Sequence, residues 1–371
     1  MPAGKKIRNS CSFTTTLIRN TKKMSESGQS NISKTMSDQS NISYDEEDGH
    51  LKVKVGDSIG PWTAVDRIGI GQYGMVWTVE DDTKVLKIMR SGEDHRDMIE
   101  SEIEILQSLT SDYLMQLDST LDHANQDRIH KVLVMERMEK DLFTLLHEDE
   151  EVVTHAAGAR MIRQMLRGVA ALEEAKIVHL DLKPENILLQ GDMLKIADFG
   201  TAQRLPMKEI PLYGKTTEYR ALEVIMDLED CNAKADVWSA ACVIYEIVTR
   251  MHGQTTLLFE PREVSIAAED LEDPDEEIDL NHLYLIQEVL GQVPKHMHRH
   301  CQEYFTVRGE LRGGIGKVML RSLDELMVED GIEDVDLWMD FFTPMLRYNP
   351  KKRFSALDMV DHKCLAPTKS T

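Results

Sequence analysis

The stretch His179-Leu180-Asp181-Leu182-Lys183-Pro184-Glu185-Asn186 is followed, twelve residues after its last member, by Asp198-Phe199-Gly200. One short loop therefore offers a carboxylate, a cation and a carboxamide, and a second carboxylate arrives at hairpin distance. Phosphoryl transfer needs this set. A carboxylate accepts the proton of a hydroxyl nucleophile, a lysine steadies the moving phosphoryl group, and oxygen ligands hold Mg²⁺ on the phosphates. The two segments predict a phosphoryl-transfer site rather than a polar surface loop.

A glycine-rich segment lies upstream, in Gly69-Ile70-Gly71-Gln72-Tyr73-Gly74-Met75-Val76. Glycines at this spacing let the backbone lie close to a triphosphate, and Val76 would cover an adenine ring. Apolar residues flank the segment at Val65, Ile68, Val76 and Val79. This alternation predicts a hairpin of two strands around the glycines.

A lysine and a glutamate follow the glycine-rich segment. Lys87 lies in the short β-branched run at residues 85–88, and residues 96–109 predict an amphipathic helix with apolar residues on one face. That face comprises Ile99, Ile103, Leu106 and Leu109. Glu102 lies beside it and is either a solvated surface charge or the partner that fixes Lys87 on the α- and β-phosphates.

Length and composition bound the possibilities. The chain has 371 residues with 42% hydrophobic content, which is enough for a sizeable core. No apolar run reaches the roughly 18 residues needed to span a bilayer, so we expect a soluble protein without membrane association. The five cysteines are odd in number and scattered, which favours a reducing compartment, the cytoplasm or the nucleus.

Charge is distributed unevenly along the chain. Residues 1–44 contain seven Lys or Arg and two acidic residues, so they carry a net charge of +5. Because the whole chain carries −22, residues 45–371 carry −27. Acidic residues concentrate at 45–48, at 148–151 and from Glu269 to Asp279. Such a surface repels nucleic acid and attracts basic partners. The Ser/Thr-rich composition of residues 1–44 predicts a disordered arm.

These motifs resemble those of the protein kinases, and further stretches resemble the SR-protein kinases in particular. The stretches are Leu51–Asp57, Tyr219–Val224, Ala235–Cys242, Leu258–Pro261, Leu290–Pro294 and Phe342–Leu346. The resemblance covers about residues 45–365. The chain also departs from that group. Residues 138–179 leave no room for its long spacer, and Leu180, Glu218 and Val85 differ from its usual residues. Glu218 leaves peptide choice beside the phosphoacceptor open.

The resemblance implies an α+β, bilobal protein-kinase fold with ATP between the lobes. Residues 45–138 would form an antiparallel five-stranded sheet with one helix, and residues 139–366 a mainly helical lobe. An acidic insert is expected at about residues 254–280 and a short tail at residues 367–371. The insert would form an acidic groove that docks Arg-rich substrates, and we expect its acids to act in this way.

The resemblance also assigns roles to the motif residues. Asp181 would be the base, Lys183 would stabilise the transferring group, and Asn186 and Asp198 would hold Mg²⁺. Lys87, set by Glu102, would orient the phosphates, and Thr216 would hydrogen-bond Asp181 and Lys183. The expected ATP-binding residues are Gly69, Gly71, Gly74, Val76, Val85, Lys87, Met135, Glu136 and Met138. Among them, Met135 would be the gatekeeper and Met138 the hinge contact.

The implied activity is ATP-dependent phosphorylation of serine, with threonine left open, in Arg-rich protein segments such as Arg/Ser repeats. We expect a monomer that does not bind nucleic acid directly. Two alternatives remain. One is a Pro-directed or dual-specificity kinase, which Tyr219-Arg220-Ala221 also suits. The other is a catalytically inactive scaffold, which the complete set of catalytic residues argues against.

Overall fold

The computed structural model describes residues 49–71, 73–125, 128–150, 152–207, 217–228, 230–262, 274–299, 301–315 and 318–367. The predicted arm at residues 1–44, the predicted contact residue Thr216 and most of the acidic run at residues 269–279 lie outside them. The chain divides into two compact units. One extends to Ile103 and includes Gln116–Arg137, and the other holds Glu104–Met115 and continues from Met138.

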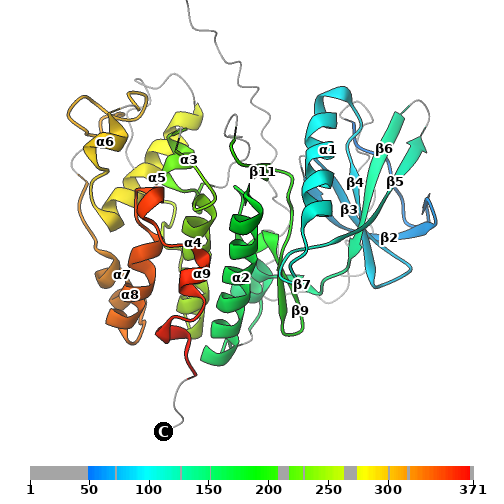
Figure 1. The fold of residues 1–371 in the computed structure, drawn as a ribbon. Coiled ribbons are helices and arrows are strands. Elements are labelled where there is room, and N and C mark those ends of the chain that lie inside the picture. The colour runs from blue at the N-terminus through cyan, green and yellow to red at the C-terminus, as the bar shows by residue number, and fades with distance from the viewer. Residues whose placement is uncertain are drawn as a thin grey trace, which may run out of the picture. The chain divides into compact units, whose positions relative to one another are not determined.

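The first unit is an antiparallel sheet with one helix (Figure 1). Its strands are β1 (Ser58–Ile59), β2 (Trp62–Gly71), β3 (Gly74–Val79), β4 (Lys84–Met89), β5 (Leu117–Asn125) and β6 (Arg128–Glu136), in the order β1-β2-β3-β4-β6-β5. Helix α1 runs from Glu93 to Ser108. The sheet has six strands rather than the predicted five, because the two-residue β1 joins the edge of β2. The expected α+β class is confirmed.

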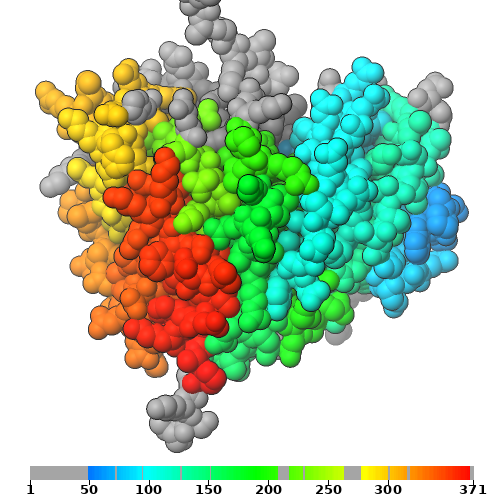
Figure 2. Space-filling view, in the orientation of Figure 1, coloured from blue at the N-terminus to red at the C-terminus, as the bar shows by residue number. Residues whose placement is uncertain are grey.

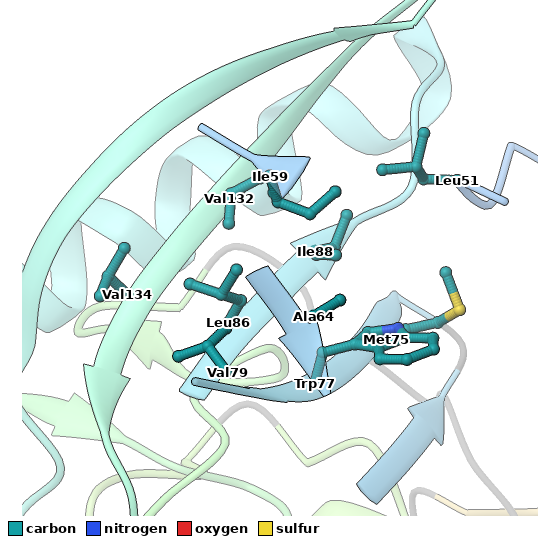
Figure 3. Close-up of a cluster of buried hydrophobic side chains, with 10 residues drawn as sticks. All are labelled: Leu51, Ile59, Ala64, Met75, Trp77, Val79, Leu86, Ile88, Val132 and Val134. Atoms are coloured by element: carbon teal, nitrogen blue, oxygen red, sulfur yellow. The ribbon is translucent and has the colours of Figure 1, made fainter. Parts of the chain in front are cut away.

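The core of the first unit lies on one face of this sheet (Figure 3). It consists of Leu51, Ile59, Ala64, Met75, Trp77, Val79, Leu86, Ile88, Val132 and Val134. Each large apolar side chain buried here contributes roughly 1.5–3 kcal/mol. The predicted hairpin around the glycines is confirmed as β2 and β3, although Val65 and Ile68 are 43% and 55% exposed and do not join the core. Two register shifts in β2 interrupt the period of two, so Ala64 points inward instead.

The second unit is mainly helical. Its helices are α2 (His155–Ala175), α3 (Leu222–Ile225), α4 (Ala235–Met251), α5 (Pro274–Leu290), α6 (Lys295–His298), α7 (Leu323–Glu329), α8 (Val335–Met345) and α9 (Ala356–Met359). Short strands form two small sheets, one of β7 (Lys140–Asp141), β9 (Ile187–Gln190) and β10 (Met193–Ile196), the other of β8 (Ile177–Val178) and β11 (Gln203–Arg204). One-turn segments occur at η3 (Thr144–Glu148), η4 (Pro184–Asn186), η6 (Pro350–Lys352) and η7 (Lys363–Leu365).

Helix α4 forms the centre of the second unit. Every residue from Ala235 to Thr249 is buried, as expected for a helix that is apolar on all sides. Helix α2 packs against it and is capped by the Thr154 hydroxyl, which accepts the Ala157 N–H. The C-terminal segments α9 and η7 contact α2, and Figure 2 shows them in red beside its green surface. No helix among the described residues has the length and apolar character needed to cross a bilayer.

Candidate active site

The loop at residues 179–186 lies between β8 and β9 and is anchored to α4 by hydrogen bonds. Asp236, in the first turn of α4, is completely buried and accepts the backbone N–H groups of His179 at 2.7 Å and Leu180 at 3.0 Å. Burial raises the pKa of Asp236, and these two hydrogen bonds oppose the shift. They also stabilise the left-handed backbone of Leu180, whose φ of 67° is unfavourable for a branched residue.

Asp181, Lys183 and Asn186 are in direct contact. The Lys183 ammonium lies 2.9 Å from one Asp181 oxygen and 3.2 Å from the other. The Asn186 amide nitrogen donates to the Asp181 carbonyl at 2.8 Å and to its carboxylate at 2.9 Å. Both amide hydrogens of Asn186 therefore face Asp181, which leaves its carbonyl oxygen as the group suited to a cation.

The surroundings of Lys183 keep it charged. Burial lowers the pKa of Lys183, but the charge and hydrogen bond of Asp181, with the charges of Glu185 and Asp198, outweigh burial and raise it overall. Lys183 is a cation held beside the carboxylate, and the Asp181 side chain remains 28% exposed. This arrangement suits a base that receives a proton from a substrate hydroxyl.

The β9–β10 hairpin brings Asp198 back toward Asn186. Residues 187–190 pair with residues 193–196, and the Ala197 N–H donates to the Asn186 carbonyl at 2.8 Å. Asp198 follows directly, exposed and with φ at 61°, while Phe199 is buried against His179. A carboxamide and a carboxylate oxygen are ligands that Mg²⁺ accepts, and Mg²⁺ takes its other ligands from water and phosphates. The pair fits this ion, although the described chain contains no cluster of three His, Cys, Asp or Glu arranged for a metal.

Four of the predicted ATP-binding residues of the first unit share one face of the sheet. Val76 lies opposite Lys87, Val85 lies opposite Met135, and Val85 and Lys87 are two residues apart on β4. Because side chains alternate between faces, these four lie on the face opposite the core. Lys87 is buried there, and its ammonium lies 2.6 Å from the Glu102 carboxylate of α1. Glu102 is therefore a buried partner and not a solvated surface charge.

The glycines of the β2–β3 turn differ in the space around them. A Cβ at Gly74 would lie 2.3 Å from the Ile88 carbonyl oxygen, so the packing of the sheet itself excludes a side chain there. A Cβ at Gly71 would meet no atom of the described chain within 4 Å, and Gly69 would touch only Val76. The open space at Gly71 is compatible with the predicted approach of a phosphate. Glu136 is the last residue of β6, and Met138 is the first residue of the longer segment of the second unit.

The segment after Thr216 is fixed on α4 and on a buried ion pair. Glu223 is contacted by both terminal nitrogens of Arg353, at 2.6 and 3.0 Å, and neither side chain is exposed. The Ser239 hydroxyl donates to the Tyr219 carbonyl at 2.7 Å. Residues 217–223 thus form a strip that is anchored to α4 and to Arg353.

A group of carboxylates beside this strip was not among the predicted site residues. Glu246 of α4 is completely buried, accepts the Tyr219 hydroxyl at 2.8 Å and lies 2.8 Å from the His147 ring. Burial raises the pKa of Glu246, and Glu218 adds to the shift. One Glu218 oxygen is buried without a hydrogen-bond partner among the described residues. The available signal was Glu246 itself, an acid within an otherwise apolar helix.

Glu185 completes this group, which we name the acidic cluster: Glu185, Glu218 and Glu246. Glu185 is exposed as a residue, but its carboxyl is partly enclosed. That burial, with the charges of Glu246 and Asp181, raises the pKa of Glu185. The charges of all three cluster members contribute to raising the pKa of Tyr219, after burial of its ring. The charges of the three carboxylates therefore all act on the Tyr219 side chain.

The predicted acidic docking run is only partly within the described residues. Asp270 and Asp273 lie outside them, as do the side chains of Asp275 and Glu276. Glu277 is exposed, whereas Asp279 is buried and accepts the Tyr304 hydroxyl at 2.8 Å. Asp279 is part of the packing of α5, and the docking role of the other acids stays a prediction.

Comparison with known proteins gives one consistent result. Residues 62–365 match the family described as "Protein kinase domain". Serine/threonine-protein kinase AFC1 of Arabidopsis thaliana is 27% identical, covering 86% of this chain and 74% of the relative. Serine/threonine-protein kinase SRPK of Physarum polycephalum is also 27% identical, covering 86% and 89%. The probable dual specificity protein kinase madd-3 of Caenorhabditis elegans is 26% identical, covering 76% and 32%.

Proposed function

Because the chain belongs to the protein kinase family and is a serine/threonine protein kinase, we propose that it phosphorylates serines in Arg-rich protein segments such as Arg/Ser repeats. The observation that carries this choice of substrate is the acidic cluster. The charges of Glu185, Glu218 and Glu246 all act on Tyr219, within the strip at residues 217–223. One oxygen of Glu218 is buried and has no hydrogen-bond partner among the described residues.

The residues of the two units have separate tasks in the proposed reaction. Asp181 accepts the proton of the serine hydroxyl, and Lys183 stabilises the phosphoryl group as it moves. Protein kinases use ATP and Mg²⁺, and the bound metal neutralises charge on the phosphates. Asn186 and Asp198 would hold that ion. In the first unit, Lys87 binds the phosphates in the position that Glu102 fixes, and Gly71 lets the backbone approach them.

Arginine is the substrate side chain that the acidic cluster fits best. A guanidinium has five donors in a planar fork and keeps its charge at all relevant pH values, so it can bind several carboxylate oxygens at once. A buried acceptor without a partner costs about 1–3 kcal/mol, which a bound guanidinium would recover. The −27 charge of residues 45–371 adds attraction at long range.

A pair of peptides tests this proposal. We expect a serine peptide with flanking arginines to show a kcat/KM at least about tenfold above its alanine-substituted counterpart, the size of one charged hydrogen bond. The variant Glu218→Gln should reduce the preference, whereas Glu174→Gln, on the exposed side of α2, should not. Equal kcat/KM for the two peptides would rule out the Arg-rich substrate.

The acidic run before and within α5 is proposed as a second contact for long substrates. Neutralising Asp270, Asp273, Asp275, Glu276 and Glu277 should raise KM for a long Arg/Ser substrate and weaken its salt dependence, because exposed charge pairs are screened. A short peptide that does not reach the run should be unaffected. An unchanged KM for the long substrate would leave the run as a solvated surface.

A Pro-directed or dual-specificity activity is the second candidate. It is favoured by the Tyr219-Arg220-Ala221 segment and by the similarity to a relative named as a dual specificity kinase. A peptide with proline directly after the serine, compared with the Arg-flanked peptide in the same assay, distinguishes the two. A higher kcat/KM for the proline peptide would favour this candidate.

A further inference from the structure

His147 is the basic side chain in contact with the acidic cluster. It lies in η3, its ring stacks on Phe143 with centroids 4.5 Å apart, and its side chain is 22% exposed. Its Nε2 lies 2.8 Å from the Glu246 carboxylate. A carboxylate oxygen only accepts hydrogen bonds, so this ring nitrogen donates whether the imidazole is neutral or protonated.

The turn that carries His147 is held at both ends. The Asp141 carboxylate accepts the Thr144 N–H at 2.7 Å, and Lys140 pairs with Asp149 at 2.6 Å. The Thr255 hydroxyl donates to the Leu146 carbonyl at 3.0 Å. The imidazole is therefore placed against Glu246 by several independent contacts, so the 2.8 Å approach is a feature of the fold.

We propose that His147 is a positioning residue for substrate selection, which keeps the buried Glu246 carboxylate charged and oriented to bind a substrate arginine. The inference rests on the proposed function. A completely buried carboxylate retains its charge only when donors replace its lost hydration. Glu246 has two such donors, the Tyr219 hydroxyl and His147, and no permanently charged group contacts it among the described residues.

The hydrogen bond to His147 is the largest influence that opposes burial in setting the pKa of Glu246. Among the residues that the structure describes, the titratable groups around Glu246 are His147, Tyr219, Glu218, Glu185 and Cys242. Of these, His147 alone can carry a positive charge. Removing its donor would let Glu246 take up a proton at a higher pH and would leave its carboxyl group free to rotate.

Two amide variants separate this role from simple packing. In His147→Gln the amide nitrogen reaches about as far as Nε2, whereas in His147→Asn it ends near the position of Nδ1 and does not reach Glu246. Both side chains are polar, neutral and smaller than imidazole, so they are matched for folding. We expect His147→Asn to raise KM for the Arg-flanked peptide about tenfold, as for the loss of one hydrogen bond to a charged group. His147→Gln should stay within about threefold of the wild type.

The alanine-substituted peptide and the pH profile complete the test. His147→Asn should leave kcat and the KM of the alanine peptide unchanged, and should move the loss of Arg preference to higher pH. If the wild type shows no Arg preference, the proposed function fails. If the wild type prefers arginine but the Asn and Gln variants behave alike, or if both peptides are affected equally, the role of His147 is refuted while the proposed function stands.

Discussion

Glu223 and Glu246 are both completely buried in the second unit, and the structure satisfies them in opposite ways. Glu223 binds both terminal nitrogens of Arg353, whose remaining donors go to the carbonyls of Arg347 and Lys234. Among the described residues, Glu246 has only a hydroxyl and an imidazole as hydrogen-bond partners, and the charges of two further carboxylates act on the same region. One glutamate is neutralised inside the fold, and the other leaves a negative region to which a ligand can bind.

Burial alone therefore does not distinguish a structural glutamate from a functional one. A buried ion pair with every donor satisfied is evidence for a rigid scaffold, since nothing remains for a ligand. A buried carboxylate without a permanently charged partner is costly for stability, and such groups concentrate at functional sites. Asp181 is a third case. It is partly exposed, and its carboxylate contacts the Lys183 ammonium and the Asn186 amide of the same loop.

The largest expected effect is on catalysis at Asp181. Asp181→Asn removes the base and should reduce kcat by about 10²–10⁴-fold, while ATP binding and the thermal midpoint remain near those of the wild type. The control is Asp192→Asn, which alters an exposed carboxylate of the same unit. A near-normal kcat for Asp181→Asn, measured with a peptide substrate, would show that Asp181 is not the base.

Breaking the scaffold pair should have the next largest effect, on stability. Arg353→Met leaves Glu223 charged and buried without its partner and should reduce the free energy of unfolding by about 3–5 kcal/mol. Arg353→Lys keeps the charge but loses the bidentate geometry, and should fall between wild type and Arg353→Met. Chemical denaturation measures both. A change below about 1 kcal/mol for Arg353→Met would remove the distinction between the two glutamates.

Glu246→Gln tests the other side of the comparison. We expect KM for the Arg-flanked peptide to rise about tenfold, equivalent to 1.4 kcal/mol, with kcat unchanged. Stability should change by less than for Arg353→Met, because Glu246 has no permanently charged partner among the described residues. Peptide kinetics and denaturation on the same preparation decide the matter. A large loss of stability without a change in KM would place Glu246 with Glu223 in the scaffold.

The sequence predicted those parts of the site that depend on short spacings. Asp181, Lys183 and Asn186 lie within six residues, and the β9–β10 hairpin that brings Asp198 close is also local. Residue spacing and elementary chemistry were enough for these groups. They left Glu102 as either a surface charge or the partner of Lys87, and the resemblance to the protein kinases assigned the pair.

Other features depend on contacts between distant residues and were not predictable in this way. His147 and Glu246 are 99 residues apart, and their contact exists only because η3 packs on α4. The inward face of β2 depends on two register shifts that alternation does not reveal, so the exposure of Val65 and Ile68 could not be predicted. Asp279 looks like one acid among many in the sequence, and only packing against Tyr304 shows it to be buried.

The smallest expected effect is a dependence of substrate choice on pH. Burial raises the pKa of Glu246 and Glu185, so these groups take up protons at a higher pH than ordinary carboxylates as the pH falls. Arginine keeps its charge throughout, so the attraction weakens only through protonation of the enzyme's carboxylates.

The ratio of KM for the Arg-flanked peptide to KM for the alanine peptide should therefore rise severalfold as the pH falls from about 8 to about 5.5. Glu246→Gln removes one of the two titrating groups and should flatten the curve, whereas Arg353→Lys should leave its shape unchanged. A ratio that stays constant with pH would mean that the acidic cluster does not contact the arginines.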